Sequence, residues 1–279
     1  MRTSSRLGES PRWDHRRGEL VWVDILGRLV HLSNPDGTTR SFPVDREVGS
    51  VALYGEGAYL LALRDGFGVW EDGTLRSVST VDAPGLRLND GAVDPAGRFL
   101  AGTTGLEDGG MVGRVYSREV DGSVRVVLEG VSISNGLAWS DHGATLYYVD
   151  SAAGGVDIFD YDAGTGTLSN RRRHIEVPPA LGVADGIALD AEGCLWVAIY
   201  GGGQVCRYSP AGMLIARVDV PAAQTTACCF GGPQLDTMFI TTATQHLDLS
   251  RPEHALSGGL FVAEPGCGGR PERVVPLSR

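Results

Sequence analysis

The chain has 279 residues, a net charge of −10, 42% hydrophobic residues and 21% charged residues. These numbers suit one large globular domain or two small ones. They argue against nucleic acid and anionic membranes as partners, because both bind clusters of basic residues. There is no apolar run of about 18 residues to predict a membrane-spanning helix, and the first nine residues lack the apolar segment of a secretory signal.

The numbers of cysteine and glycine residues indicate the cellular compartment and the type of fold. The chain has five cysteines, which is an odd number, and no CxxC pair; Cys228 and Cys229 are adjacent. This pattern favours buried thiols over a disulfide framework, so we expect a protein of the reducing cytoplasm. Glycine contributes 40 residues, about twice its usual share, which indicates many turns between short strands.

Taken in chain order, the predicted elements are short strands rich in Val, Ile, Leu, Tyr and Trp. Turn signals such as Asp72-Gly73 and Asp121-Gly122 separate them, and no segment combines a helical period with caps. We therefore predict an all-β fold. The strand-like runs are residues 19–25, 58–63, 98–102, 124–128, 146–149, 156–161, 195–200, 205–208, 213–220, 238–242 and 259–262.

A polar residue followed by a short stretch of small or apolar residues recurs every 40 to 50 residues. We call these polar residues the head residues, and they are Glu9, Ser50, Asp90, Asn135, Asp185 and Thr226. Six repeats of this length, each with about four strands, predict a single six-bladed β-propeller domain over residues 1–279. We expect strands from both termini to close the first or the last blade.

In a propeller, equivalent positions on the innermost strands face one another around a central channel. The head residues should therefore form a ring. A single Asp-Gly or Asn-Gly pair favours an ordinary turn, but the shared register of several such pairs favours a common site. Carboxylates that converge on one point repel each other unless a cation neutralises them. Carboxylate and amide oxygens, as in Glu9, Asp90, Asn135 and Asp185, are ligands of hard divalent cations.

Longer motifs appear in order over nearly the whole chain. They are LGESPRW at 7–13, RLNDG at 87–91, DPAGR at 94–98, ISNGLAWS at 133–140, ADG at 184–186, LWVA at 195–198 and CCFGG at 228–232. These motifs resemble the SMP-30/gluconolactonase/luciferin-regenerating-enzyme family, which includes regucalcin and bacterial sugar lactonases. The resemblance implies a six-bladed β-propeller with one divalent metal in its channel, and hydrolysis of sugar lactones.

Site residues follow from the resemblance by motif. It implies Glu9, Asn135 and Asp185 as metal ligands, with Asp185 also the catalytic acid or base. Arg87 and Asn89 match substrate-contacting positions, and Asp90 lies beside them.

Two loops differ in length from what the resemblance and the propeller fold lead us to expect. Members such as regucalcin have a longer segment after the Ala-Gly-Thr motif, with a glutamate that contacts substrate. In the shorter segment here, Glu107 and Asp108 are the candidates for that contact. The loop at residues 244–257, which contains His246, is long for a propeller, and we expect it to narrow the pocket.

The predicted function is a metal-dependent hydrolase that opens a sugar lactone such as gluconolactone, a small-molecule partner. The metal would polarise the carbonyl, Asp185 would help deliver water, and Arg87 and Asn89 would orient the sugar. Oxygen ligands favour Ca²⁺ first, then Mg²⁺ or Mn²⁺, while an open three-ligand site also accepts Zn²⁺ or Fe²⁺. Two alternatives stay open: a phosphotriester hydrolase of the same propeller type, and a calcium-binding regulatory protein without catalysis.

Overall fold

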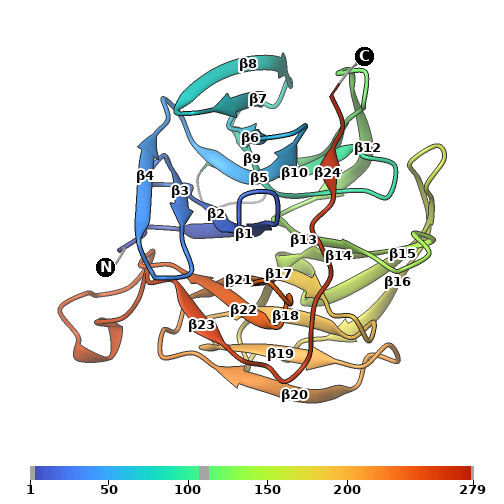
Figure 1. Cartoon of the computed structure of the whole chain (residues 1–279). Coiled ribbons are helices and arrows are strands. Elements are labelled where there is room, and N and C mark those ends of the chain that lie inside the picture. Colours follow the sequence, from blue (N-terminus) through green and yellow to red (C-terminus); the bar gives the residue numbers. More distant parts are fainter. Residues whose placement is uncertain (1–3, 107–112, 278–279) are drawn as a thin grey trace.

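Six sheets surround a central axis in the computed structural model, which describes residues 4–106 and 113–277 (Figure 1). In five sheets one strand lies at the axis and the next strands follow outward in chain order as antiparallel hairpins, and the sixth sheet follows the same plan with one added parallel strand. The predicted all-β class and six-bladed β-propeller are therefore confirmed. Within the described ranges, no helix has the length and apolar character that a membrane crossing needs.

The first three blades are contiguous in the chain. Blade 1 contains β1 (Gly8–Asp14), β2 (Glu19–Asp24), β3 (Leu29–Ser33) and β4 (Thr39–Pro43). Blade 2 contains β5 (Val48–Tyr54), β6 (Ala58–Leu63), β7 (Gly66–Glu71) and β8 (Thr74–Thr80). Blade 3 contains β9 (Leu86–Val93), β10 (Phe99–Gly105), β11 (Gly113–Arg118) and β12 (Val124–Val131).

The last three blades follow the same plan. Blade 4 contains β13 (Ser134–Trp139), β14 (Thr145–Asp150), β15 (Gly155–Asp162) and β16 (Thr167–Glu176). Blade 5 contains β17 (Val183–Leu189), β18 (Leu195–Tyr200), β19 (Gln204–Tyr208) and β20 (Leu214–Asp219). Blade 6 contains β21 (Thr225–Gly231), β22 (Thr237–Thr242) and β23 (Phe261–Ala263). Two short 3-10 helices, η1 (Ser151–Ala153) and η2 (Pro252–His254), lie in connections.

The core lies between neighbouring blades, because each blade buries both of its faces. All residues of β5 and β6 are buried, whereas the outermost strand β20 is almost entirely exposed. Side chains of β2 and β6 share one apolar cluster, which joins blades 1 and 2. This burial explains why the inner strands read as continuous apolar runs in the sequence and only the outer strands are polar.

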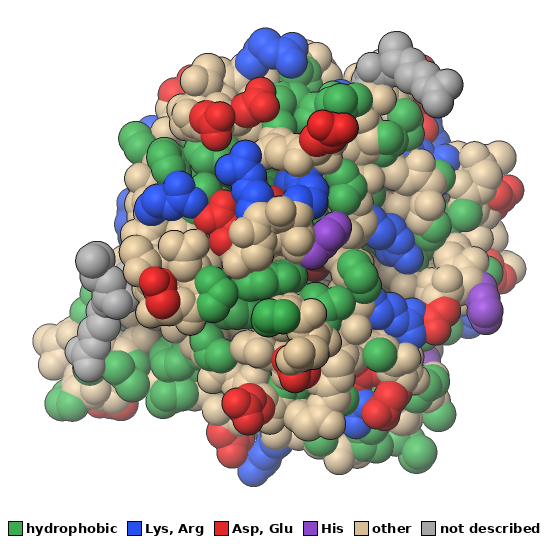
Figure 2. All heavy atoms as spheres, in the orientation of Figure 1, with side chains coloured by type: hydrophobic (Ala, Val, Ile, Leu, Met, Phe, Trp, Pro, Cys, Tyr) green, Lys and Arg blue, Asp and Glu red, His purple; other side chains and the backbone are tan. Residues whose placement is uncertain are grey.

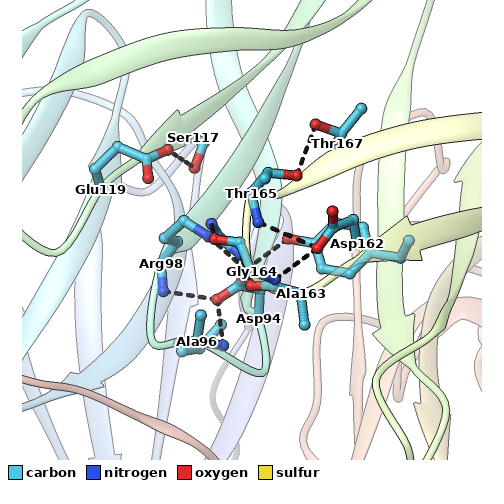
Figure 3. A network of polar contacts seen from close by, with 12 residues as sticks. Asp94, Ala96, Arg98, Ser117, Glu119, Asp162, Ala163, Gly164, Thr165 and Thr167 are labelled. Carbon is cyan, nitrogen blue, oxygen red and sulfur yellow. Dashed lines mark hydrogen bonds and ion pairs between the residues drawn. The ribbon is translucent and has the colours of Figure 1, made fainter.

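Buried aspartates after the inner strands connect one blade to the next. The carboxylate of Asp94 accepts hydrogen bonds from the Arg98 guanidinium (2.6 Å) and, across the blade boundary, from the Tyr161 hydroxyl (2.5 Å). Arg98 donates in turn to the Ala163 carbonyl of blade 4 (Figure 3). Asp14 accepts a hydrogen bond from Tyr59 in the same way, from blade 1 to blade 2. Because these carboxylates are fully buried and hydrogen-bonded, they fix how adjacent blades pack.

Each head residue lies at a β-bulge. The pairing register between the innermost strand and its neighbour shifts next to the head residue in all six blades. A bulge leaves an extra residue unpaired and re-aims its side chain. The repeat found in the sequence is therefore a repeated backbone irregularity on the innermost strand of every blade.

The glycine after a head residue serves close packing rather than a turn. A Cβ atom at Gly136 would lie 2.8 Å from the carbonyl oxygen of Asp185, and one at Gly186 would lie 2.9 Å from that of Thr226. Neighbouring innermost strands thus approach so closely at the bulges that a side chain does not fit. The Asp-Gly and Asn-Gly pairs at the head positions are strand residues at a crowded axis.

The expected closure by strands from both termini is wrong for the described residues. Blade 1 takes all its strands from one N-terminal segment and blade 6 takes all of its strands from one C-terminal segment. The two blades meet side by side: the Thr226 hydroxyl donates to the Gly8 carbonyl (2.6 Å), and a single bridge pairs Leu7 with Ala243. The physical reason is that β1 continues directly into three hairpin partners of its own, which completes its sheet.

The C-terminal segment instead runs across the propeller. After β23 the chain passes over one end of the channel and ends in β24 (Val274–Val275), which pairs in parallel with β5 of blade 2 (Figure 1). We call residues 264–277 the strap. Figure 2 shows this face, on which basic and acidic side chains are interspersed.

Candidate functional site

A cavity of about 330 Å³ opens at the end of the channel opposite the strap, where the innermost strands begin. It contains the three predicted metal ligands, Glu9, Asn135 and Asp185, and the two predicted substrate contacts, Arg87 and Asn89. These side chains are all buried. The other lining residues are Leu7, Leu26, Thr104, Gly105, Leu106, Ile133, Ser151, Val183, Tyr200, Gln245 and His246.

A chain of hydrogen bonds holds the polar floor of this cavity. The Arg87 guanidinium donates to Asn89 Oδ1 (2.6 Å), and Asn89 Nδ2 donates to Asn135 Oδ1 (2.7 Å). Asn135 Nδ2 donates to the Ser151 hydroxyl (2.7 Å), which donates to the carbonyl of Ala184 (2.7 Å). The chain of hydrogen bonds thus crosses three blades and ends beside Asp185, so it fixes these four side chains relative to that carboxylate.

The carboxylates of the floor perturb one another. Burial, and then the charge of Asp90, raise the pKa of Glu9 to about 8. Burial, followed by the charges of Glu9 and Asp90, raises the pKa of Asp185 well above its ordinary value. Burial lowers the pKa of Arg87 to about 10, although Glu9 and Asp185 act in the opposite direction. Burial and the repulsion between these carboxylates therefore disfavour their charged forms, and the guanidinium of Arg87 does not offset this effect.

This arrangement fits a divalent cation. Asp185 Oδ1 is buried and has no hydrogen-bond partner, which is costly for a polar atom in a folded chain. The nearby donors are the carboxylate of Glu9 and the amide oxygen of Asn135, and hard cations prefer such oxygens. A cation at this point would satisfy the unpaired oxygen and lower the repulsion between the carboxylates.

The remaining head residues take other roles. Asp90 does not line the cavity in the described part of the chain; its carboxylate lies 3.7 Å from the Arg12 guanidinium, deeper in the channel. Its predicted contact with substrate remains a prediction. The Thr226 hydroxyl is used between blades, and Ser50 is fully buried. Neither Ser50 nor Thr226 is among the described residues that line the cavity.

Two predicted features of the rim have different outcomes. His246 does line the cavity, on a loop whose backbone nitrogens bond back to residues 5 and 6. Its φ of 62° lies in the left-handed region that non-glycine residues seldom adopt. Glu107 and Asp108, the candidates for a further substrate contact, lie outside the described residues.

Ser151 is the clearest site residue that the sequence argument missed. It follows β14 and reaches Asn135 only because the β13–β14 hairpin pairs Ser134 with Asp150. Extending that hairpin from its turn would have placed residue 151 beside the head residue. Val183, an apolar residue of the rim, belongs to no motif and could not have been found in this way.

The fold and this cavity define a six-bladed β-propeller with an oxygen-rich pocket at one end of its channel. A family model described as the SMP-30/Gluconolactonase/LRE-like region matches residues 7–244. The chain belongs to this family, as its motifs suggested.

Named relatives cover most of the chain. Regucalcin of Xenopus laevis is 42% identical over 268 residues, which are 92% of this chain and 90% of the relative. The putative sugar lactone lactonase YvrE of Bacillus subtilis is 35% identical over 274 residues, 96% of this chain and 94% of the relative. Among solved structures, a regucalcin of Agrobacterium tumefaciens, described as a calcium-binding protein, superposes with a TM-score of 0.91 at 32% identity, covering 99% of this chain and 95% of the other.

Proposed function

We propose that this chain is a divalent-metal-dependent hydrolase that opens the ring of a sugar lactone. One observation carries the proposal: an unpaired carboxylate oxygen of Asp185 faces a buried set of oxygen donors, and a preorganised guanidinium–amide pair lies in the same cavity. The names of the relatives, regucalcin and sugar lactone lactonase, support the same class.

Glu9, Asn135 and Asp185 would hold the cation, and Ca²⁺ is our first choice because all three supply oxygen. When bound, the cation supplies a Lewis acid that polarises the lactone carbonyl. Arg87 and Asn89 bind the hydroxyls or the ring oxygen of the lactone and fix its orientation. Their mutual hydrogen bond holds both groups in place before substrate arrives.

Asp185 acts as the acid and base of the reaction. Its carboxylate takes a proton from the water that attacks the carbonyl carbon, and a new C–O bond forms. The ring C–O bond then breaks, and the proton passes to the departing ring oxygen. The product is one open chain with a free hydroxyl and a carboxylic acid, and the acid releases the second proton of the water to solvent to become a carboxylate. Burial of Asp185 matches this role, because it raises the pKa of the carboxylate above its ordinary value and so makes the carboxylate a stronger base.

The test is a panel of substrates with the purified full chain. We expect hydrolysis of δ-gluconolactone that stops on treatment with EDTA and returns with one of Ca²⁺, Mn²⁺, Mg²⁺, Zn²⁺ or Fe²⁺. Asp185→Ala should lower kcat at least about 1,000-fold, because it removes both a ligand and the base. Full activity of a folded Asp185→Ala protein would exclude this assignment.

The same panel tests the two alternatives. Hydrolysis of an organophosphate such as paraoxon, without lactone hydrolysis, would indicate a phosphotriesterase. Tight Ca²⁺ binding without any turnover would indicate a regulatory calcium-binding protein. The hydrogen-bond chain from Arg87 to Ser151 favours a substrate pocket over an ion buffer, because a buffer needs no guanidinium beside its ligands.

A further inference from the structure

The mouth of the cavity differs in character from its floor. Above the charged floor most lining residues are apolar, namely Leu7, Leu26, Leu106, Ile133, Val183 and Tyr200, while Gln245 and His246 form a polar part of the rim. Ile133 and Val183 are each 42% exposed, and Leu106 is 39% exposed. Three of the eleven exposed large hydrophobic side chains in the described residues thus gather at one opening. Single exposed hydrophobic residues are ordinary, whereas a cluster around a pocket marks a binding surface.

These side chains stand on fixed backbone. The N–H of Ile133 donates to the Asp150 carboxylate (3.0 Å), and its carbonyl accepts from Ser151 (3.0 Å). Val183 pairs with Tyr200 at the start of the β17–β18 hairpin. The N–H of Leu106 donates to the carbonyl of Gly85 (3.1 Å). The apolar mouth is therefore built from at least three blades and exists before any substrate binds.

The hydroxyl groups of a sugar lactone match the polar floor but not the apolar side chains of the mouth. Hydroxyl groups placed against Ile133 and Val183 would lose hydrogen bonds to water and gain none from these side chains. An alkyl or aryl group at the same place would leave water and cover exposed apolar surface. The floor and the mouth are thus complementary to two different parts of one molecule.

Building on the proposed function, we infer that the preferred substrate is a lactone whose ring carries an apolar alkyl or aryl substituent. The ester group of the ring faces Asp185 and Arg87 on the floor. The substituent lies between Ile133 and Val183 at the mouth. The ring is opened as described above, so the product is a hydroxy acid with the apolar group still attached.

Three lactones test this inference in the full chain loaded with its activating metal. δ-Nonalactone carries a butyl group that δ-valerolactone lacks, and δ-gluconolactone carries hydroxyls instead. Each fully buried methylene is worth up to about fourfold in binding, and the mouth is only partly enclosed. We therefore expect kcat/KM for δ-nonalactone to exceed that for δ-valerolactone by roughly 10- to 50-fold.

Substitutions at the mouth test whether its apolar side chains cause the preference for δ-nonalactone. The double variant Ile133→Ser, Val183→Ser should lower the δ-nonalactone to δ-valerolactone ratio of kcat/KM at least about fivefold, and Val183→Leu should keep it. Met213→Ser is the matched control, since Met213 is an exposed apolar residue of blade 5 far from the cavity lining. A thermal melt of each variant confirms that it is folded.

The outcomes separate this inference from the proposed function. Hydrolysis of δ-gluconolactone with a ratio near one for the other two lactones would overturn the inference and leave the proposed function standing. A high ratio that the double variant does not change would also overturn it, because the mouth would not be the cause. If no lactone is opened with any metal, the proposed function fails and this inference fails with it.

Discussion

At the scale of single residues, Ser151 determines how the amide of Asn135 is oriented. The Ser151 hydroxyl donates to the Ala184 carbonyl, so it has only an acceptor left for Asn135 Nδ2. The amide oxygen of Asn135 must then face Asn89 and the cavity. Asn135 therefore presents its amide oxygen to the cavity because the Ser151 hydroxyl already donates its proton to Ala184.

Ser151→Ala should therefore weaken metal binding. Without the hydroxyl the Asn135 amide loses the contact that sets its orientation, and loss of such an outer partner typically costs 10- to 100-fold in metal affinity. We expect the Ca²⁺ Kd to rise by about that factor in isothermal titration calorimetry, while Ser151→Thr stays near the original value. Ser140→Ala, at the other end of the same hairpin, is the control. Equal Kd values for Ser151→Ala and Ser140→Ala would contradict the argument.

His31 is a buried titratable group away from the cavity. Its side chain is 3% exposed, stacks on Trp22 with ring centroids 4.1 Å apart, and has a buried Nε2 without a partner. Burial lowers the pKa of His31 to about 4. In the unfolded chain the pKa is about 6.5, so between pH 6.5 and pH 4 the unfolded state binds the proton and the native state does not.

Stability should accordingly fall as the pH drops through this window. The lowered pKa predicts a loss from His31 on the order of 3 kcal/mol between pH 7 and pH 4. His31→Phe keeps the ring stack but cannot titrate, so its unfolding free energy should depend less steeply on pH. Urea unfolding at pH 7, 5.5 and 4.5 measures the difference between the two proteins. Parallel curves would show that His31 does not contribute.

At the scale of elements, the bulge and the glycine that follows it bring the ligands together. Glu9, Asn135 and Asp185 stand on different innermost strands, and the strands that carry Asn135 and Asp185 approach closely at Gly136, the residue after the head residue Asn135. The glycine at 136 is thus as necessary to the site geometry as the asparagine before it.

Gly136→Ala tests this requirement. The added Cβ would lie 2.8 Å from the Asp185 carbonyl oxygen, so blades 4 and 5 must move apart. We expect a loss of roughly 1–3 kcal/mol in unfolding free energy and a tenfold or larger loss in lactone kcat/KM, since small misplacements at a site are costly. Gly268→Ala is the control, because its nearest neighbour would be 3.6 Å away. The two variants should differ clearly in a thermal melt and in the lactone assay.

How well the sequence predicted each feature depends on whether the feature follows from a local pattern in the chain or from the packing of distant segments. The head residues were identifiable because one bulge per blade recurs at a regular spacing, and equivalent positions in a propeller meet at its axis. Asp90 shares that spacing, yet it lies near Arg12 rather than in the cavity, and only the packed channel decides that orientation. The path of the strap was not predictable either, because a two-residue strand such as β24 has no periodicity to detect.

At the scale of the whole molecule, the strap adds a connection that the blades do not provide. Blades 1 and 6 are joined directly by hydrogen bonds between residues 5–8 and the segments of blade 6, and the strap then leaves blade 6, crosses the end of the channel and pairs with blade 2. On its way Glu272 approaches the guanidinium of Arg12 to 3.9 Å. Val275 then packs into the core of blades 2 and 3 with no exposed surface. The strap therefore spans the junction between the first and last blades.

Val275→Asp should release the strap and destabilise the propeller. An unpaired carboxylate would replace a fully buried side chain, and the bond from the Gly55 N–H to the Val275 carbonyl (2.9 Å) would be lost with it. We expect a loss of about 3 kcal/mol or more in urea unfolding, and rapid amide exchange or proteolysis within residues 264–277. Leu277→Asp is the control, since Leu277 is 57% exposed. Because the strap and the cavity lie at opposite ends of the channel, lactone kcat/KM well below the melting temperature should change less than about twofold; a large loss there would mean that the strap also shapes the site.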